Sequence, residues 1–180
     1  MNVVSTPFKD LFVLEPKVFG DARGYFMESY NRETLLKNGI DINFVQDNQS
    51  QSTRGVLRGL HFQSNPHAQT KLVRVLSGSI LDVVVDLRKK EPTFGQHFAV
   101  ELSSGNKKQM LVPKGFAHGF VVLSEIAEVF YKCDEFYRPE SDGGIHYTSV
   151  DADWGIPMGD LLLSDKDKKL PHIREAKFDF

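Results

Sequence analysis

Apolar and polar residues alternate in short runs through the middle of the chain. Leu72–Leu76 and Ile80–Leu87 are rich in β-branched residues, and Ser77–Gly78–Ser79 lies between them. Because glycine accepts the positive φ of a tight turn, this arrangement predicts two strands joined as a hairpin. In the second run Leu81, Val83, Val85 and Leu87 fall on one face, and the charged residues Asp82, Asp86 and Arg88 fall on the other, so this strand is expected to be half-buried.

More strands of the same kind follow. They are predicted at Phe98–Leu102, Gln109–Val112, Phe120–Leu123 and Ile126–Cys133. The last two should form another hairpin around Ser124 and Glu125. Turn residues recur regularly along this stretch, and no long helical period separates the strands. The pattern favours an all-β sandwich or barrel.

Helix should be limited to one or two short segments. Asn31 can cap the first helix, Leu35 and Leu36 are its expected buried residues, and Gly39 can end it. The second predicted helix is Asp165–Lys169, just before a proline.

Composition narrows the class of protein. The 180 residues suit a single domain over residues 1–180. Lys and Arg number 22 against 24 Asp and Glu, so no basic field marks a nucleic-acid-binding protein. Cys133 is the only cysteine, which excludes an internal disulfide and fits a reducing compartment. Without a signal-peptide pattern or an apolar run of membrane length, we expect a cytoplasmic protein with no membrane contact. The charged tail from Ile173 to Phe180 is expected to be loosely held.

Candidate acid–base residues gather on these predicted strands. His61 lies in the run from Arg58 to Gln63, and Lys71 begins the next strand. Side chains on rigid strands can be aimed into one cavity, and an imidazole exchanges protons near neutral pH. A lone histidine would more often be structural. Here His118 and Tyr131 follow on later strands of the same β-rich stretch, which favours a functional site.

The same motifs resemble a known family. They are, in chain order, Gly20–Glu28, Phe44–Ser50, Arg58–Gln63, Lys71–Arg74, Pro113–Gly119 and Leu163–Asp167. In residue types and spacing, from about Phe8 to Pro171, the chain resembles the dTDP-4-dehydrorhamnose 3,5-epimerase family. The resemblance implies a cupin-type jelly roll, also called a double-stranded β-helix. It also implies an epimerase without metal or other cofactor, and a homodimer in which strands from one subunit help build the other subunit's site.

The implied reaction inverts C3 and C5 of a dTDP-4-keto-6-deoxy sugar through enolates. Inverting a carbon next to a ketone requires a base on one face of the ring, an acid on the other and a group that stabilises the oxyanion. His61 suits the base, and by resemblance Asp167 holds it. Lys71 suits the oxyanion at C4 and Tyr131 suits the acid, both expected on strands that flank the His61 strand.

The resemblance and hydrogen-bonding capacity assign further residues to substrate binding. They are Arg23, Phe26, Glu28, Gln46, Asn48, Arg58, His118, Tyr137 and Asp142. The first three should reach into the neighbouring subunit's site, where Phe26 could stack on thymine. One loop departs from the family pattern: Glu-Arg-Gly-Ile-Arg-Trp is replaced by Asp142–Tyr147, so base selectivity could differ.

Three other functions stay open from the sequence. A mono-epimerase would use the same acid–base residues to invert only C3 or only C5. A metal-dependent cupin oxygenase or isomerase would use His61, His67 and His118, although metal cupins tend to present two histidines one residue apart and a nearby glutamate. A non-catalytic sugar-nucleotide-binding module would keep the pocket without needing the acid–base set.

Overall fold

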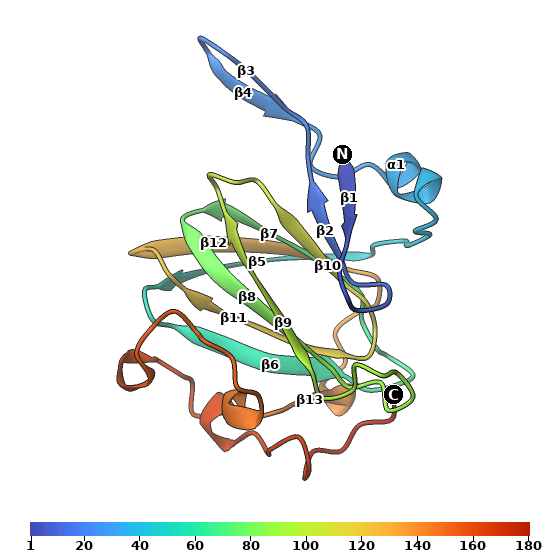
Figure 1. Ribbon diagram of the computed structural model, residues 1–180, viewed down its shortest axis with the longest axis vertical. Helices are drawn as coiled ribbons and strands as arrows, with labels where there is room; N and C mark the ends of the chain where they lie inside the picture. The colour runs from blue at the N-terminus through green and yellow to red at the C-terminus, as the bar shows by residue number, and fades with distance from the viewer.

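Two antiparallel sheets face each other in the computed structural model, which describes residues 1–180 (Figure 1). The six-stranded sheet has the order β1 (Asn2–Ser5), β2 (Phe12–Glu15), β10 (Gln109–Val112), β7 (Lys71–Ser77), β12 (Ile126–Cys133) and β5 (Gln46–Thr53). The five-stranded sheet has the order β13 (Asp142–Gly144), β6 (Leu57–Gln63), β11 (Phe116–Val122), β8 (Ser79–Asp86) and β9 (His97–Ser103). A separate hairpin of β3 (Val18–Asp21) and β4 (Gly24–Met27) projects from the sandwich.

Strands that follow one another in the sequence mostly belong to opposite sheets. β7 pairs with β10 and β12, whereas β8 pairs with β11 and β9. The predicted hairpin around Gly78 is therefore wrong, and so is the one between β11 and β12. Gly78 does adopt a φ of 77°, but its turn carries the chain from one sheet to the other. This connectivity makes an all-β jelly roll, which confirms the expected fold class.

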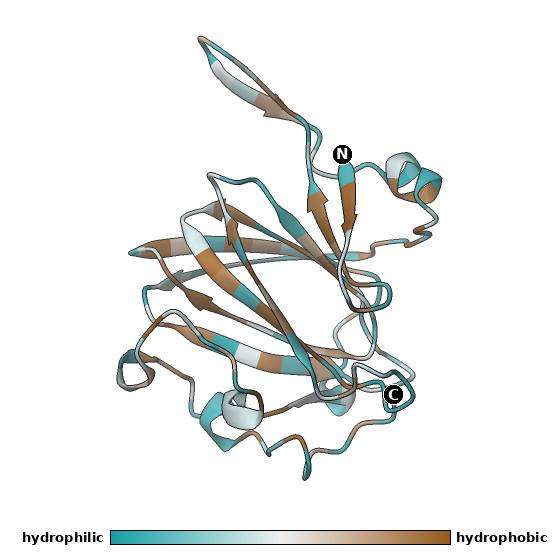
Figure 2. Cartoon of the chain, in the orientation of Figure 1, coloured by the Kyte–Doolittle hydropathy of each residue, from teal (hydrophilic) through white to brown (hydrophobic).

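The hydrophobic core has two parts, and β8 contributes to both. Ile80 and Val84 pack between the sheets, while Val83 and Val85 pack on the outer face of the five-stranded sheet. The segment from Ile145 to Phe180 covers that outer face. Figure 2 shows apolar and polar residues alternating along several of the strands. The prediction of a half-buried strand is therefore wrong. Asp82 shares the inner face and is completely buried.

Helix is scarce, as expected. α1 (Arg32–Lys37) begins at Asn31, whose Oδ1 accepts a hydrogen bond from the Thr34 N–H at 3.1 Å. Leu35 is buried, but Leu36 is exposed, contrary to expectation. The remaining helices are single 3₁₀ turns: η1 (Pro139–Ser141), η2 (Tyr147–Ser149), η3 (Met158–Asp160) and η4 (Asp167–Lys169). η4 is shorter than the helix predicted there. None of these helices is long or apolar enough to cross a membrane.

The C-terminal tail is packed rather than loosely held. The ring centroids of Phe178 and Phe180 lie 6.1 and 5.8 Å from that of Phe62. The Lys89 ammonium donates a hydrogen bond to the Phe178 carbonyl at 3.0 Å. The expectation rested on the charged residues of the tail and overlooked Phe178 and Phe180, which bury apolar area against the five-stranded sheet.

A close approach of β6 and β11 generates a prediction for stability. A Cβ on Gly119 would lie 2.6 Å from the Arg58 carbonyl oxygen and 2.9 Å from the Gly59 Cα. Because backbone cannot move aside as a side chain can, Gly119→Ala should lower the free energy of unfolding by about 1–3 kcal/mol. Gly105→Ala, in the open β9–β10 turn, should change it by no more than about 0.5 kcal/mol. Urea denaturation measures both, and equal effects would contradict the packing described.

Candidate active site

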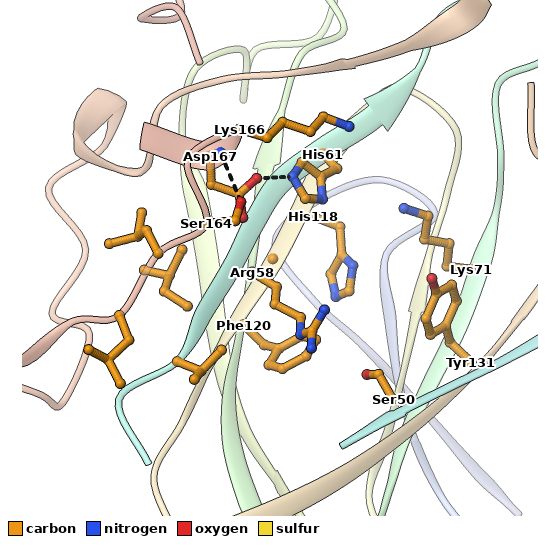
Figure 3. Close-up of a pocket in the computed structure, with 15 residues that line it drawn as sticks. Ser50, Arg58, His61, Lys71, His118, Phe120, Tyr131, Ser164, Lys166 and Asp167 are labelled. Atoms are coloured by element: carbon orange, nitrogen blue, oxygen red, sulfur yellow. Dashed lines mark hydrogen bonds and ion pairs between the residues drawn. The ribbon is translucent and has the colours of Figure 1, made fainter. Parts of the chain in front are cut away.

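A cavity of about 480 Å³ opens between the two sheets. The five-stranded sheet contributes Arg58, His61, His118 and Phe120 to its lining, and the six-stranded sheet contributes Ser50, Lys71 and Tyr131 (Figure 3). Ser164, Lys166 and Asp167 close the cavity from the segment that follows the loop Asp142–Tyr147, which is called the altered loop below. All four predicted catalytic residues therefore lie around one cavity.

His61 is paired with Asp167. The Nε2 of His61 lies 2.6 Å from the Asp167 Oδ1, and the Asp167 N–H donates a hydrogen bond to the Ser164 Oγ at 3.1 Å (Figure 3). Burial alone would raise the pKa of the Asp167 carboxyl, but its hydrogen bond to His61, the charge of that ring and hydrogen bonds from Ser164 and Gly59 hold the pKa below its usual value. An ionised Asp167 can orient the imidazole and stabilise its protonated form.

Lys71 and Tyr131 lie on the wall opposite His61. Their strands, β7 and β12, are neighbours in the six-stranded sheet, whereas β6 has β13 and β11 as neighbours. The expectation that their strands flank the His61 strand is wrong, because the chain changes sheet between β6 and β7. The consequence is chemical: His61 and Tyr131 approach the cavity from opposite sides.

The environments of Lys71 and Tyr131 shift the pKa values of both side chains. Burial lowers the pKa of the Lys71 ammonium, while negative charge on Cys133, Asp142 and Asp82 acts in the opposite direction. Burial also raises the pKa of the Tyr131 phenol, and Cys133 adds to this rise. Tyr131 therefore keeps its proton at neutral pH and is available as a donor.

Most residues assigned to substrate binding lie in or beside the cavity. Arg58 lines it, with its Nε donating a hydrogen bond to the Ser52 Oγ at 3.0 Å. Gln46 and Asn48 share a face of β5 with Ser50, and the Gln46 Nε2 donates to the Asn48 Oδ1 at 3.0 Å. The Gln46 Oε1 in turn accepts a hydrogen bond from the Tyr137 N–H at 3.0 Å.

The altered loop keeps an acidic residue beside the site. Asp142 forms an ion pair with Lys166, which itself lines the cavity. Its neighbour Gly143 leaves room for the Phe62 ring, since a Cβ there would lie 2.9 Å from that ring. An arginine at this position would therefore need a different packing of Phe62, the ring against which Phe178 and Phe180 of the tail pack.

Three of the assigned residues lie away from the cavity of their own chain. Arg23 and Phe26 belong to the projecting hairpin, and Glu28 follows it (Figure 1). Arg23 forms an ion pair with Asp21 at 2.6 Å, and Phe26 is 68% exposed. Conversely, Ser50, Ser164 and Lys166 line the cavity without having been assigned a role, although each lay within one of the family motifs.

The histidines considered as metal ligands are engaged separately. His61 contacts Asp167, the His118 Nε2 lies 2.6 Å from the Asp82 Oδ1, and the His67 Nδ1 lies 2.9 Å from the Ser141 Oγ. No three His, Cys, Asp or Glu side chains are arranged to hold a metal ion. The geometry does not favour a metal-dependent cupin.

A jelly roll with an imidazole–carboxylate pair facing a lysine and a tyrosine across one cavity defines a class of protein, the cupin-type proteins equipped for acid–base chemistry. The family model of dTDP-4-dehydrorhamnose 3,5-epimerase matches residues 5–175. The chain belongs to this family.

Individual relatives agree over nearly the whole chain. The dTDP-4-dehydrorhamnose 3,5-epimerase of Shigella flexneri is 51% identical over 170 residues, covering 93% of each chain. The crystal structure of the enzyme of that name from Elizabethkingia anophelis is 50% identical and superposes with a TM-score of 0.93, covering 97% of each chain. A dTDP-6-deoxy-D-glucose-3,5-epimerase from Legionella pneumophila, in complex with dTDP-4-keto-L-rhamnose, is 46% identical with a TM-score of 0.92 and covers 97% of this chain and 93% of that one.

The lowered pKa of Asp167 predicts how stability changes in acid. Its stabilising contribution is present above the carboxyl's unfolded pKa of about 3.9 and is lost as pH falls through the lower folded value. The difference in unfolding free energy between the unmodified protein and Asp167→Asn should therefore shrink below about pH 4. Urea titrations at several pH values measure it, with the exposed Asp165→Asn as a control. A difference that stays constant with pH would rule this effect out.

Proposed function

We propose that this chain inverts C3 and C5 of dTDP-4-dehydro-6-deoxy-D-glucose to give dTDP-4-dehydro-L-rhamnose, without a metal or other cofactor. The observation that carries this proposal is the placement of the His61–Asp167 pair and Tyr131 on opposite walls of one cavity. Membership of the family and the relative crystallised with dTDP-4-keto-L-rhamnose supply the substrate class.

The mechanism begins with removal of a proton next to the C4 ketone. His61 takes the proton from C5 or C3, the C–H electron pair moves into the enolate, and Asp167 stabilises the imidazolium that forms. The Lys71 ammonium hydrogen-bonds to the C4 oxygen, where negative charge develops. Tyr131 returns a proton to the opposite face of the ring, which inverts the carbon. Its phenolate then recovers a proton from solvent, and the His61 imidazolium releases to solvent the proton that it took.

Polar groups at the side of the cavity would bind the nucleotide part of the substrate. The Arg58 guanidinium can form paired hydrogen bonds with diphosphate oxygens. Gln46 and Asn48 can bind base and sugar edges, and Tyr137, which is 53% exposed, offers an aromatic face beside them. His118 and Asp142 complete the set on the cavity wall and rim.

We further propose that the site is completed in a homodimer. The β3–β4 hairpin exposes the large apolar side chains of Phe19, Tyr25 and Phe26, which its own chain leaves uncovered. A partner surface that buries these rings would offset the cost of their exposure to water. In the partner's site Arg23 and Glu28 could bind the nucleotide and Phe26 could stack on thymine. Residues 1–180 would act as one domain in the cytoplasm, where the buried free thiol of Cys133 stays reduced.

Solvent labelling tests the reaction directly. In deuterated buffer, purified protein should introduce deuterium at both C3 and C5 of the substrate, because each inversion exchanges one carbon-bound proton. NMR of the sugar locates the label, and EDTA should leave the rate unchanged. Label at one carbon only would replace this proposal by a mono-epimerase. Loss of activity that iron, manganese or zinc restores would indicate a metal-dependent cupin, and no label at all would favour a binding module.

Substitutions at the two walls should have different effects. His61→Ala should abolish exchange, with a loss of at least the roughly 10²- to 10⁴-fold expected for general acid–base catalysis. Tyr131→Phe should still exchange protons with little inversion, because the enolate forms and is reprotonated from its original face. Tyr30→Phe serves as a matched control and should behave as the unmodified protein. Near-normal exchange by His61→Ala would refute the assignment of the base.

Mixed dimers test whether the hairpin acts on the partner's site. A His61→Ala subunit keeps an intact hairpin, and a subunit carrying Arg23→Ala and Phe26→Ala keeps an intact cavity. Each variant alone should be nearly inactive. After mixing through denaturant, heterodimers should contain one complete site, so activity should return to about a quarter of the unmodified level. Absence of recovery in verified heterodimers would show that the hairpin serves its own chain, and normal activity of the hairpin variant alone would show that the hairpin is not needed.

A further inference from the structure

A second histidine–aspartate pair lies beneath the cavity, and the reaction described so far does not use its carboxylate. Asp82 on β8 is completely buried, and its Oδ1 lies 2.6 Å from the His118 Nε2. Its other oxygen, Oδ2, is buried and has no hydrogen-bond partner. Burying a carboxylate that is only half hydrogen-bonded is costly, and each such group in a native protein calls for an explanation, of which a role at a catalytic site is one.

A neighbour on the same strand shows how this fold satisfies a structural carboxylate. Asp86 is also completely buried, but both of its oxygens are engaged: the Arg88 guanidinium contacts them at 2.9 and 2.7 Å, and the Thr93 hydroxyl donates at 2.6 Å. Asp86 lies outside the cavity lining, whereas the partner of Asp82 belongs to it. The incomplete bonding of Asp82 is therefore a feature of its place under the site.

His118 connects Asp82 to the reacting groups. In the β6–β11 ladder His118 lies directly opposite His61, and both rings line the cavity (Figure 3). With the Nε2 of His118 held by Asp82, the Nδ1 is the ring nitrogen left to contact a ligand. Each of the two facing histidines is thus anchored through Nε2 by its own carboxylate, Asp167 or Asp82.

We propose that Asp82 is a positioning residue for the epimerisation proposed above, on which this inference rests: its carboxylate holds the His118 ring in the cavity wall and places a negative charge near the Lys71 ammonium. Held in this way with its proton on Nε2, His118 presents Nδ1 as an acceptor to a hydroxyl group of the bound sugar nucleotide. The charge of Asp82 helps Lys71 to stay protonated, so that the lysine can meet the oxyanion as a cation.

The effect on Lys71 follows from the charges around it. Burial disfavours its protonated form, and Asp82 is one of three groups whose negative charge counteracts this. The titratable and charged groups around Lys71 are Cys133 and Tyr131 on β12, His118 on β11, His61 and Arg58 on β6, Asp82 on β8, Asp142 on β13, and Lys166 and Asp167 in the closing segment. Removing one negative charge from this set should lower the pKa of Lys71 further.

Asp82→Asn, with Asp86→Asn as its matched control, tests the proposal in the full-length protein. Asp82→Asn should lower kcat by about 10- to 100-fold, as for other carboxylates that orient a functional histidine, with KM nearly unchanged. The alkaline limb of its kcat profile should move to lower pH, while its Tm stays equal or rises because a half-bonded buried carboxylate is gone. Asp86→Asn should do the reverse: it should lower Tm and leave kcat per folded molecule and the pH profile unchanged.

Two outcomes would contradict a proposal, and they can be told apart. If the unmodified protein inverts the sugar and Asp82→Asn keeps kcat within about twofold, or its alkaline limb does not move, the positioning role is wrong while the proposed function stands. If the unmodified protein does not turn the sugar over, the proposed function fails first.

A measurement without any variant covers the case in which Asp82→Asn does not fold. In the unmodified protein labelled with ¹⁵N-histidine, NMR should show the His118 proton on Nε2 throughout the active pH range, with a low-field proton shift from the short hydrogen bond to the carboxylate. A His118 ring protonated only at Nδ1 would overturn the proposal.

Discussion

The separation of two catalytic walls is the constraint on which the proposed chemistry depends. Facing sheets pack about 10 Å apart, so side chains from the two sheets approach a flat ring from opposite faces. In this protein the five-stranded sheet presents His61 and the six-stranded sheet presents Lys71 and Tyr131. Because the chain changes sheet between β6 and β7, residues only ten positions apart in the sequence end on opposite walls. Inversion at carbon needs this geometry, since the proton must leave from one face and return to the other.

The residue proposed as the base, His61, also depends on the outer layer of the molecule. Asp167 lies in the segment that packs against the outer face of the five-stranded sheet, where Trp154, Phe178 and Phe180 contribute to the second core. Gly144 lets this segment approach closely, because a Cβ there would lie 2.9 Å from the Leu170 side chain, three residues after Asp167. Packing outside the cavity thus fixes the carboxylate that is paired with His61. Loss of the aromatic contacts in the tail should therefore loosen this segment and change the position of Asp167 relative to His61.

Sequence patterns predicted the strands and the first helix better than they predicted which strands pair. The signal at Gly78 is local, since a positive φ and flanking β-branched residues suit a hairpin and a corner between two sheets equally well. Asp82 was misplaced for a related reason: alternation identifies two faces of a strand but cannot tell that both are buried. The cavity residues His61, Lys71, Tyr131 and Asp167 were found because their motifs carry a family pattern as well as a local one. The assignment of Arg23, Phe26 and Glu28 to the neighbouring subunit's site stays a prediction, since a single chain does not contain the surface that they are proposed to meet.

A crystal structure of the protein with a bound dTDP-4-keto-6-deoxy sugar, or with a dTDP-sugar that cannot lose its proton, would test the central claim most directly. The distances to measure are those from C5 to the His61 ring nitrogen and to the Tyr131 hydroxyl. The account predicts that both atoms lie within about 3.5 Å of C5 and on opposite faces of the ring. Both groups on the same face, or a ring bound outside the space between the two sheets, would contradict it.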